Sequence, residues 1–290
     1  MSLLIITGPT ASGKSTFALN LAQRLNGEII SADSMQIYRE CNIATAKPTP
    51  QEQQLIPHHL IDMIDPTIRF SAALWAEAAR EAIAQIRARG KTPIVVGGTG
   101  FYLRALLEPQ TLAQVPPNPA LRAELEQLSP GALREKLQQL DPQAARRVDG
   151  TNIPRLIRAI EVAAGEKVLL PEMPPIQYQA YGLEWPRDVL YERINSRVDA
   201  MMAEGLMDEL RYLAAKYGKN APALEGIGYK EMLPVLDDPS LEPAQIEIWK
   251  RATRRYAKRQ MTWFRHQLKV EWLDAAKSTF MECGGLTPLL

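Results

Sequence analysis

Cysteine and histidine are scarce in this sequence, and it has no long apolar run. The 290 residues include two cysteines, Cys41 and Cys283, and three histidines. Because the two cysteines form no ligand-like cluster, neither a zinc site nor a disulfide scaffold is expected. No stretch approaches the length of a membrane span, and the N-terminus lacks the basic and apolar regions of a signal peptide. We therefore expect a soluble, cytoplasmic protein that does not associate with a membrane.

Net charge is also nearly absent, since 34 Lys and Arg residues face 33 Asp and Glu residues. Composition alone therefore gives no sign of a nucleic-acid-binding protein, and the distribution of charge has to be examined instead. The length suits one large domain, or a core that carries a second lobe, and allows a sizeable buried core.

The N-terminal segment combines a short apolar run, Leu3–Thr7, with a glycine-bounded loop and an amphipathic helix. The loop has the spacing G-x-x-x-x-G-K-S, which is typical of a phosphate-binding loop. Its glycines allow successive N–H groups to converge on phosphate oxygens, and the helix N-terminus adds a partial positive charge. Lys14 can reach the outer phosphate, and the Ser15 hydroxyl can ligate Mg²⁺. The expected phosphate-binding residues are Gly8, Thr10, Ala11, Ser12, Gly13, Lys14, Ser15 and Thr16.

Two further apolar runs predict strands that are parallel to the first. Glu28–Ala32 follows the first helix and completes a β-α-β unit, and Thr92–Val96 follows a second helix that begins near Ser71. We therefore predict an α/β fold with a P-loop core and a parallel sheet. The polar segments after these strands belong at the carboxyl edge of the sheet, where α/β proteins bind ligands.

Asp33 and Thr99 are the candidate catalytic residues at this edge. A carboxylate at position 33 can accept a proton from a group that attacks the phosphorylated substrate, although an Asp here can equally cap the next helix. The Thr99 hydroxyl can bind a phosphate or a nucleophile, but the surrounding glycines can also mark a tight turn. No acidic residue follows the Thr92–Val96 strand, whereas many P-loop ATPases use one there to hold Mg²⁺.

The chain changes character after about Leu107, where prolines mark a linker. Residues 115–177 are predicted to form a small all-helical insertion lobe, and residues 1–114 and 178–290 the P-loop core. Within the lobe, helices are expected at 120–127, 131–140 and 153–164. In the rest of the core we expect a strand at 177–185, helices at 188–203, 205–217, 228–236 and 243–266, and a short strand at 270–273.

The segment 250–265 is strongly basic, contains no acidic residue and has interleaved aromatics. On a helix its cations form stripes that can contact backbone phosphates, so the segment favours an RNA-binding or phosphate-binding role over a merely solvated face. The adjacent histidines His58 and His59 suggest a metal less than they suggest hydrogen bonding within a loop, because neighbouring side chains of an extended segment point to opposite sides.

Taken in order, these segments resemble the bacterial tRNA dimethylallyltransferases, also called tRNA isopentenyltransferases, over nearly the whole chain. The resemblance rests on GPTASGKS at 8–15, DSMQIYR at 33–39, HHLID at 58–62, VVGGTGFYLRALL at 95–107, RLIRAIEV at 155–162, NSRVDAMMAEGLMDE at 195–209, GIGYKE at 226–231 and RRYAKRQMTWFR at 254–265. A P-loop alone is shared by many families, but the ordered set is highly specific.

The resemblance implies that a dimethylallyl group is transferred from dimethylallyl diphosphate to N6 of adenosine-37, beside the anticodon of certain tRNAs. The base would be flipped into a channel, and pyrophosphate would leave with Mg²⁺. Asp33 matches the family's base, Thr99 matches a threonine near the reacting amine, and Lys14 belongs to the loop that would hold the diphosphate. The residues that match or are expected to contact tRNA are Asp33, Ser34, Met35, Gln36, Thr99, Arg122, Arg155, Arg158, Arg254, Arg255, Lys258 and Arg259.

The chain departs from the family pattern in one place. Some members carry an arginine that binds pyrophosphate three residues before the Gly-Tyr pair, where this chain has Glu225. Lys230 or the cluster at 254–259 would have to supply that charge. The C-terminal zinc module of some eukaryotic relatives is absent, as the cysteine count requires.

Three other functions remain open from the sequence. A P-loop kinase for a nucleoside or metabolite would use the same loop for ATP, and a relative could prenylate free adenine nucleotides. The third is a non-catalytic RNA-binding protein, which the intact Lys14, Ser15 and Asp33 disfavour. A monomer is expected for a protein that clamps the anticodon stem-loop.

Overall fold

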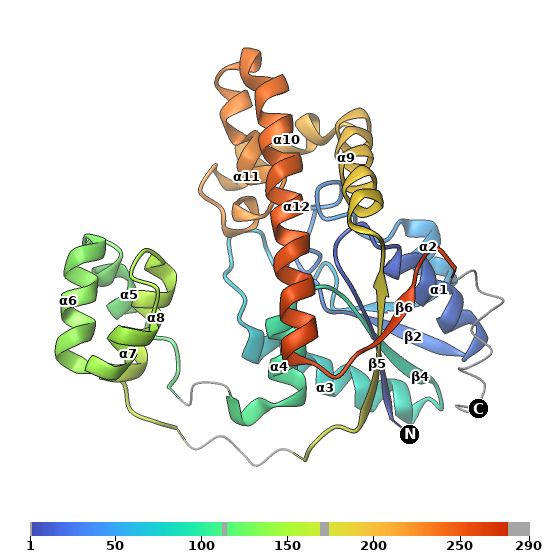
Figure 1. The fold of residues 1–290 in the computed structure, drawn as a ribbon, viewed down its shortest axis with the longest axis horizontal. Helices are drawn as coiled ribbons and strands as arrows, with labels where there is room; N and C mark the ends of the chain where they lie inside the picture. Colours follow the sequence, from blue (N-terminus) through green and yellow to red (C-terminus); the bar gives the residue numbers. More distant parts are fainter. Residues whose placement is uncertain (1, 112–114, 169–173, 278–290) are drawn as a thin grey trace. The chain divides into compact units, whose positions relative to one another are not determined.

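The computed structural model describes residues 2–111, 115–168 and 174–277 (Figure 1). The chain forms two compact units, one made of Met1–Leu107 with Pro175–Leu290 and the other of Glu108–Pro174. The lobe drawn from the sequence, 115–177, differs from the second unit at both ends. Cys283 lies outside the described residues. Among the described residues, no helix is long and apolar enough to cross a bilayer.

The larger unit is built on one parallel sheet, so the predicted α/β class is confirmed. Its strands are β1 (Leu3–Thr7), β2 (Gly27–Ser31), β3 (His58–His59), β4 (Thr92–Val96), β5 (Tyr178–Glu184) and β6 (Glu271–Asp274). The strand order is β3-β2-β4-β1-β5-β6, and every pair is parallel. β1 lies between β4 and β5, so the chain moves to one side of β1 first and to the other side later. Ligands bind at such a reversal, beyond the carboxyl ends of the strands.

Helices pack on this sheet because one stripe of each is apolar. The helices of the larger unit are α1 (Lys14–Arg24), α2 (Pro50–Leu55), α3 (Ala72–Ala88), α4 (Gly100–Leu107), α9 (Arg187–Ala203), α10 (Leu206–Tyr217), α11 (Tyr229–Met232) and α12 (Glu242–Gln267). The sequence did not predict α2 or α4. The helical segment expected around 228–236 is confirmed but is divided in two, since α11 is followed by a separate 3-10 turn, Leu233–Leu236, with Pro234 near its start. Other 3-10 turns span Pro222–Glu225 and Pro239–Leu241.

A buried tryptophan fixes the end of β2. Trp75, on α3, is fully buried and stacks on Tyr102 of α4 with ring centroids 4.7 Å apart. Its indole N–H donates to the Ser31 carbonyl at 3.0 Å, which satisfies the polar end of the ring. The backbone just before Asp33 is therefore held by the core.

The smaller unit is all-helical in its described part. Its helices are α5 (Pro119–Leu125), α6 (Pro130–Leu140), α7 (Pro142–Arg147) and α8 (Ile153–Ala164), after a 3-10 turn, Pro109–Thr111. Each α-helix has a proline in its first two positions and an N-cap side chain that accepts a backbone N–H, and these caps are Asn118, Ser129, Asp141 and Asn152. Leucines and isoleucines of α5, α6 and α8 form a separate core.

Candidate functional site

Three loops meet at the carboxyl edge of the sheet because β2, β4 and β1 are neighbours. The loop 8–13 follows β1, the segment 33–36 follows β2, and the loop 97–99 follows β4. The sequence could place each of these loops after a strand, and the strand order now brings them side by side.

The loop after β1 has the backbone of an anion-binding turn. Gly13 is left-handed, with φ of 90°, and Gly8 has φ of 141°, in a position where a Cβ would lie 2.8 Å from the Leu183 carbonyl oxygen. The first helical hydrogen bond of α1 runs from the Phe17 N–H to the Gly13 carbonyl. The N–H groups of residues 14–16 precede that bond, so they are available to an anion at the helix N-terminus.

Lys14 is a partly buried cation at the start of α1. Its ammonium donates to the Pro9 carbonyl at 3.3 Å. Burial, and then the nearby Arg197, lower the pKa of Lys14 to about 8, against a raising effect from Asp33. Lys14 is therefore charged at neutral pH but titrates in an accessible range.

We expect the affinity for inorganic pyrophosphate to depend on the charge of Lys14. Since the pKa of Lys14 is lowered to about 8, the cation is present below this pH and is lost as the pH rises through it. The ratio of pyrophosphate affinity in the wild type to that in Lys14→Arg should therefore fall above pH 8, because arginine stays charged. Calorimetry measures both affinities from pH 6.5 to 9.5. Because protonation of pyrophosphate affects both proteins equally, it cancels in the ratio. A ratio that stays constant over this range would contradict the prediction.

Two cavities adjoin this loop. The Asp33 cavity, of about 300 Å³, is lined by polar and apolar side chains including Asp33, Ser34 and Tyr256. The Arg193 cavity, of about 670 Å³, is lined by Arg193 and the outer side of the loop. The residues that line both are Lys14, Ser15, Ala46, Pro48, His58 and Arg197. Two cations, Lys14 at the end of the loop and Arg197 on α9, therefore lie where the two cavities meet.

Asp33 lies in the first cavity and also caps the local backbone. Its Oδ1 accepts the Met35 N–H at 2.8 Å, and its charge acts on both Lys14 and Arg197. The interpretation as a helix cap is wrong, because a turn rather than a helix follows Asp33, whereas its place in the cavity agrees with the interpretation as a site carboxylate.

Thr99 lies beside Ser34 but is not among the residues that line the Asp33 cavity. Its Oγ1 accepts the Ser34 N–H at 3.0 Å and lies 3.4 Å from the Ser34 hydroxyl. The structure therefore brings Thr99 to the segment that contains Asp33. Contact of Thr99 with a substrate stays a prediction.

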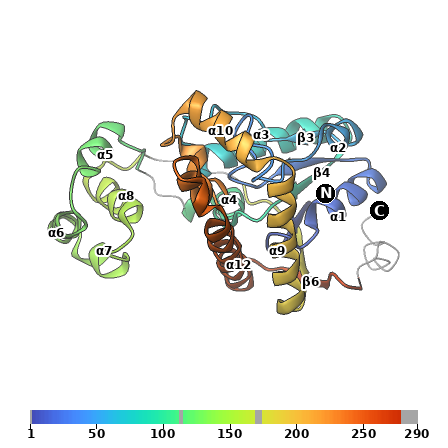
Figure 2. The ribbon, with the colours of Figure 1, turned by 90° about the horizontal axis from the view of Figure 1, so that it is seen from above.

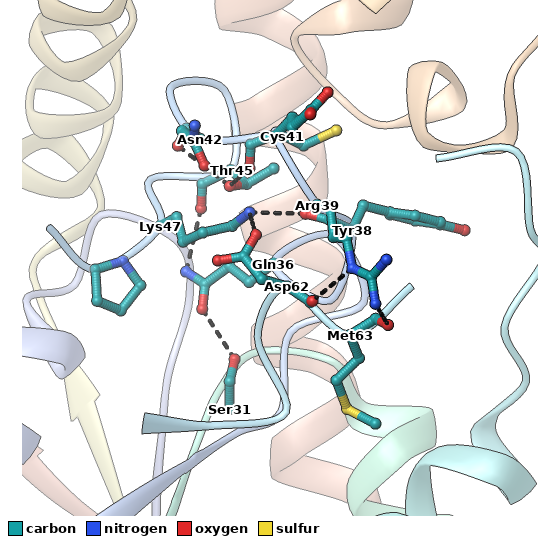
Figure 3. A network of polar contacts seen from close by, with 12 residues as sticks. Ser31, Gln36, Tyr38, Arg39, Cys41, Asn42, Thr45, Lys47, Asp62 and Met63 are labelled. Carbon is teal, nitrogen blue, oxygen red and sulfur yellow. Dashed lines mark hydrogen bonds and ion pairs between the residues drawn. The ribbon is translucent and has the colours of Figure 1, made fainter. Parts of the chain in front are cut away.

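Gln36 uses its amide within the loop that follows β2 (Figure 3). Its oxygen accepts from the Ser31 hydroxyl at 2.9 Å, and its nitrogen donates to the Thr45 and Ala46 carbonyls at 3.2 and 3.1 Å. Lys47, nearby, donates to the Tyr38 carbonyl at 2.7 Å. Gln36 thus lines the cavity while it holds residues 45 and 46, so its amide is already engaged where the sequence suggested a contact with tRNA.

Two arginines of α9 were missed from the sequence. Arg197 is partly buried and lines both cavities; desolvation lowers the pKa of its guanidinium, and Asp33 counteracts this effect. Arg193 donates to the Ala11 carbonyl at 2.9 Å and lies over the Trp185 ring. Since both residues face the phosphate loop at i, i+4 spacing, that spacing was the available signal.

Glu225, which stands where some family members carry an arginine, forms an ion pair. Glu225 lines the Asp33 cavity and binds Arg69 through both oxygens, at 2.6 and 3.0 Å. Lys230 is exposed and lines neither cavity, and none of the cations at 254–259 lines either cavity. Arg197, rather than these candidates, is the arginine that the fold places between the two cavities.

The adjacent histidines make local hydrogen bonds, as expected. His58 Nδ1 lies 2.7 Å from the Ile56 carbonyl oxygen, and His59 Nε2 lies 2.6 Å from Glu28. Burial of Glu28 alone would raise its pKa, but hydrogen bonds from Arg89, His59 and Lys91 outweigh this and lower the pKa to about 2. Within the described ranges, no three His, Cys, Asp or Glu side chains gather as a metal site would require.

The basic segment is a helix with two faces. On α12, Arg251, Arg255, Lys258 and Arg259 are exposed, whereas Gln260 is buried. Figure 2 shows α12 alongside α9, and Arg254 uses this neighbour, donating to Asn195 at 2.6 Å. Lys250 pairs with Asp199 at 2.8 Å, so some of the positive charge is compensated from another helix.

The three arginines of the smaller unit that were predicted to contact tRNA differ in their surroundings. Arg122 and Arg158 both bind the fully buried carboxylate of Glu161, at 2.8 and 3.2 Å, and Arg158 also donates to the Val115 carbonyl. A buried charge requires such partners, so these two arginines hold the unit together. Arg155 is exposed on α8 and remains the one of the three whose side chain faces solvent.

The fold and this site define a P-loop α/β protein with a helical insertion. A sequence model of the IPP transferase family matches residues 36–267. The tRNA dimethylallyltransferase of Levilactobacillus brevis is 47% identical over 94% of this chain and 92% of its own length. The full-length tRNA isopentenylpyrophosphate transferase of Bacillus halodurans aligns with a TM-score of 0.75 and 40% identity, covering 99% of this chain and 95% of that structure. A eukaryotic dimethylallyltransferase acting on tRNA aligns with a TM-score of 0.81 and 29% identity over 99% of this chain and 77% of its own.

The chain belongs to the IPP transferase family, a family of prenyltransferases whose relatives are named tRNA dimethylallyltransferases. The resemblance noted in the sequence is thereby confirmed. It extends over the whole α/β core and the helical unit.

Proposed function

We propose that the protein transfers the dimethylallyl group of dimethylallyl diphosphate to N6 of adenosine-37 in tRNA. The observation that carries this proposal is the meeting of two cavities at Lys14, Ser15 and Arg197, with Asp33 in one of them. A donor diphosphate held at this junction can present its alkyl group to an adenine that enters the Asp33 cavity. The names of the relatives support the same reaction.

The acceptor amine needs a proton acceptor, because its lone pair is delocalised into the adenine ring. As N6 forms a bond to C1 of the dimethylallyl group, the C1–O bond breaks, the diphosphate keeps the electron pair, and the N6 proton passes to Asp33. The Asp33 carboxylate is held by the Met35 N–H through one oxygen, which orients the group toward the cavity.

The leaving group needs positive charge that is already in place. The N–H groups at the start of α1, the Lys14 ammonium and the Arg197 guanidinium supply this charge without reorganisation. Ser15 lines both cavities and offers a hydroxyl oxygen, so with the diphosphate oxygens it suits Mg²⁺, which would neutralise developing charge on the leaving group.

The kinase alternative is weaker than prenyl transfer for a structural reason. β4 ends at Val96, and Gly97, Gly98 and Thr99 follow where P-loop ATPases place an acidic metal ligand. Incubation with labelled dimethylallyl diphosphate, Mg²⁺ and unmodified tRNA, in parallel with labelled ATP and nucleosides, separates the two functions. Labelled RNA without ATP supports the proposal, and labelled phosphate on a small molecule refutes it.

The exposed face of α12 is proposed to bind the RNA backbone. Arg251, Arg255, Lys258 and Arg259 carry this face, and Arg155 of the smaller unit offers another exposed cation. The cytoplasmic location and the monomeric state expected from the sequence stay predictions.

Binding of tRNA is therefore expected to weaken steeply as salt increases. Each of the substitutions Arg255→Gln and Arg259→Gln should reduce the slope of log K against log salt concentration by about 0.7 to 0.9, the value for one phosphate contact. Arg24→Gln is the matched control, since Arg24 ends α1 at the opposite edge of the sheet. Filter binding between 50 and 300 mM salt measures the slopes. Equal slopes in all proteins would mean that the exposed face of α12 does not contact RNA phosphates.

A further inference from the structure

Gln260 joins α12 to both loops of the site. It lies on the inward face of the helix and is only 6% exposed. Its side-chain oxygen accepts the Thr10 N–H at 2.9 Å, and its side-chain nitrogen donates to the Gly98 carbonyl at 2.9 Å. One amide thus connects the phosphate loop with the loop after β4, which lie about ninety residues apart in sequence.

The hydrogen bonds between β1 and the segment after β4 extend as far as Gly97. The last contacts of this kind are the Gly97 N–H to the Ile6 carbonyl at 3.1 Å and the Thr7 hydroxyl to the Gly97 carbonyl at 3.0 Å. Beyond them, Gln260 provides the connection. An amide suits this connection because it carries both an acceptor and a donor at fixed positions and holds no charge at neutral pH.

The surrounding packing shows that this connection is built closely. A Cβ on Gly98 would lie 2.1 Å from the Gln260 nitrogen, and a Cβ on Gly100 would lie 2.4 Å from the Trp263 ring. One turn before Gln260, burial raises the pKa of the Tyr256 hydroxyl, and Thr99 and Gln260 lie close enough for both side chains to lower it. The segment 98–100 is therefore covered by Tyr256, Gln260 and Trp263 of one helix.

We propose that Gln260 is a positioning residue for the transfer reaction, because its amide holds the diphosphate-binding loop and the Gly98–Thr99 loop in one fixed arrangement. The inference rests on the proposed function, in which the first loop holds the leaving group and the second supports the segment that carries Asp33. A displacement of either loop changes the alignment of the amine, C1 and the leaving oxygen. The exposed cations of α12 are on the other face, so RNA binding does not require the amide.

Gln260→Met tests this role because methionine has a similar shape and makes neither hydrogen bond. We expect kcat to fall about 10- to 100-fold, the effect of a displacement of about 1 Å, with tRNA affinity unchanged within about twofold. Gln267→Met is the control, since Gln267 is exposed on the same helix. A kcat within twofold of the wild type, or a loss confined to tRNA affinity, would overturn the proposal.

Gln260→Glu adds a readout that a purely structural residue would not give. Ionised glutamate can accept the Thr10 N–H but cannot donate to the Gly98 carbonyl, whereas protonated glutamate can do both. The kcat of this variant relative to the wild type should therefore rise as the pH is lowered, and a ratio independent of pH would count against the bridge.

Amide hydrogen exchange separates this inference from the proposed function. In Gln260→Met without any substrate, the backbone amides of residues 8–13 and 97–100 should exchange faster than those of the wild type. If the wild type transfers no dimethylallyl group and the loops still exchange faster in the variant, the proposed function fails and the bridge holds. If exchange in both loops is unchanged, the bridge is refuted whatever the reaction.

Discussion

Replacement of Asp33 by asparagine is expected to lower kcat for dimethylallyl transfer by about 10²- to 10⁴-fold, the contribution typical of a general base. Asparagine keeps the oxygen that accepts the Met35 N–H at 2.8 Å, so the local backbone should be preserved. The amide cannot accept the N6 proton at neutral pH, and the loss should therefore appear in kcat while tRNA affinity is largely retained.

The control for this substitution is Asp65→Asn. Asp65 is a partly exposed aspartate whose Oδ1 accepts the Thr67 N–H at 2.9 Å, and it lines neither cavity. Single-turnover rates and filter binding on both variants separate chemistry from binding. Near-normal turnover in Asp33→Asn would remove Asp33 from the mechanism, and a similar loss in Asp65→Asn would point to a general effect on folding.

Replacement of Arg197 by methionine is the second large effect that we expect. Arg197 lines both cavities beside Lys14, so it is placed to stabilise the charge of the departing pyrophosphate. Removal of one preorganised charge of this kind costs about 10²- to 10³-fold in kcat. Methionine removes the charge while it fills a similar volume, so the packing around position 197 should be largely retained.

Two comparisons make this test specific. Arg187→Met, at the exposed start of the same helix, should leave kcat unchanged. Because Arg197 lowers the pKa of Lys14, its removal should also shift the loss of pyrophosphate affinity to a higher pH than in the wild type. Turnover of Arg197→Met close to that of the wild type would mean that another group neutralises the leaving group.

The local parts of the fold could be predicted from the sequence, because their signals lie within a few residues. The phosphate loop, its flanking strand and helix, and the parallel strands at 28–32 and 92–96 all agree with the structure. α2 was missed although Thr49 and Glu52 form a capping box, which is a local signal. α4 was missed because it begins at Gly100, directly after a loop of small residues, which favours a turn over a helix.

The site was harder to predict where residues act across the fold. Arg197 and Gln260 come to the site from helices far away in the sequence, so nothing near the phosphate loop in the sequence points to them. For Gln260 a signal existed, since Ala257, Gln260 and Phe264 share the buried face of a helix whose other face is basic. The structural role of Arg122 and Arg158 could not be predicted either, because their shared partner Glu161 is brought to them only when α5 and α8 pack together, and their contact with tRNA stays a prediction.

Transfer of the dimethylallyl group to RNA is the measurement that decides what this site does. Protein with Mg²⁺, unmodified tRNA and labelled dimethylallyl diphosphate should yield labelled N6-dimethylallyladenosine at position 37 and an equal amount of pyrophosphate, with no requirement for ATP. The same reaction with a tRNA that lacks adenosine at position 37 should give no labelled RNA. Unlabelled RNA in both reactions, together with transfer of the terminal phosphate of ATP to a small molecule, would contradict the proposed function.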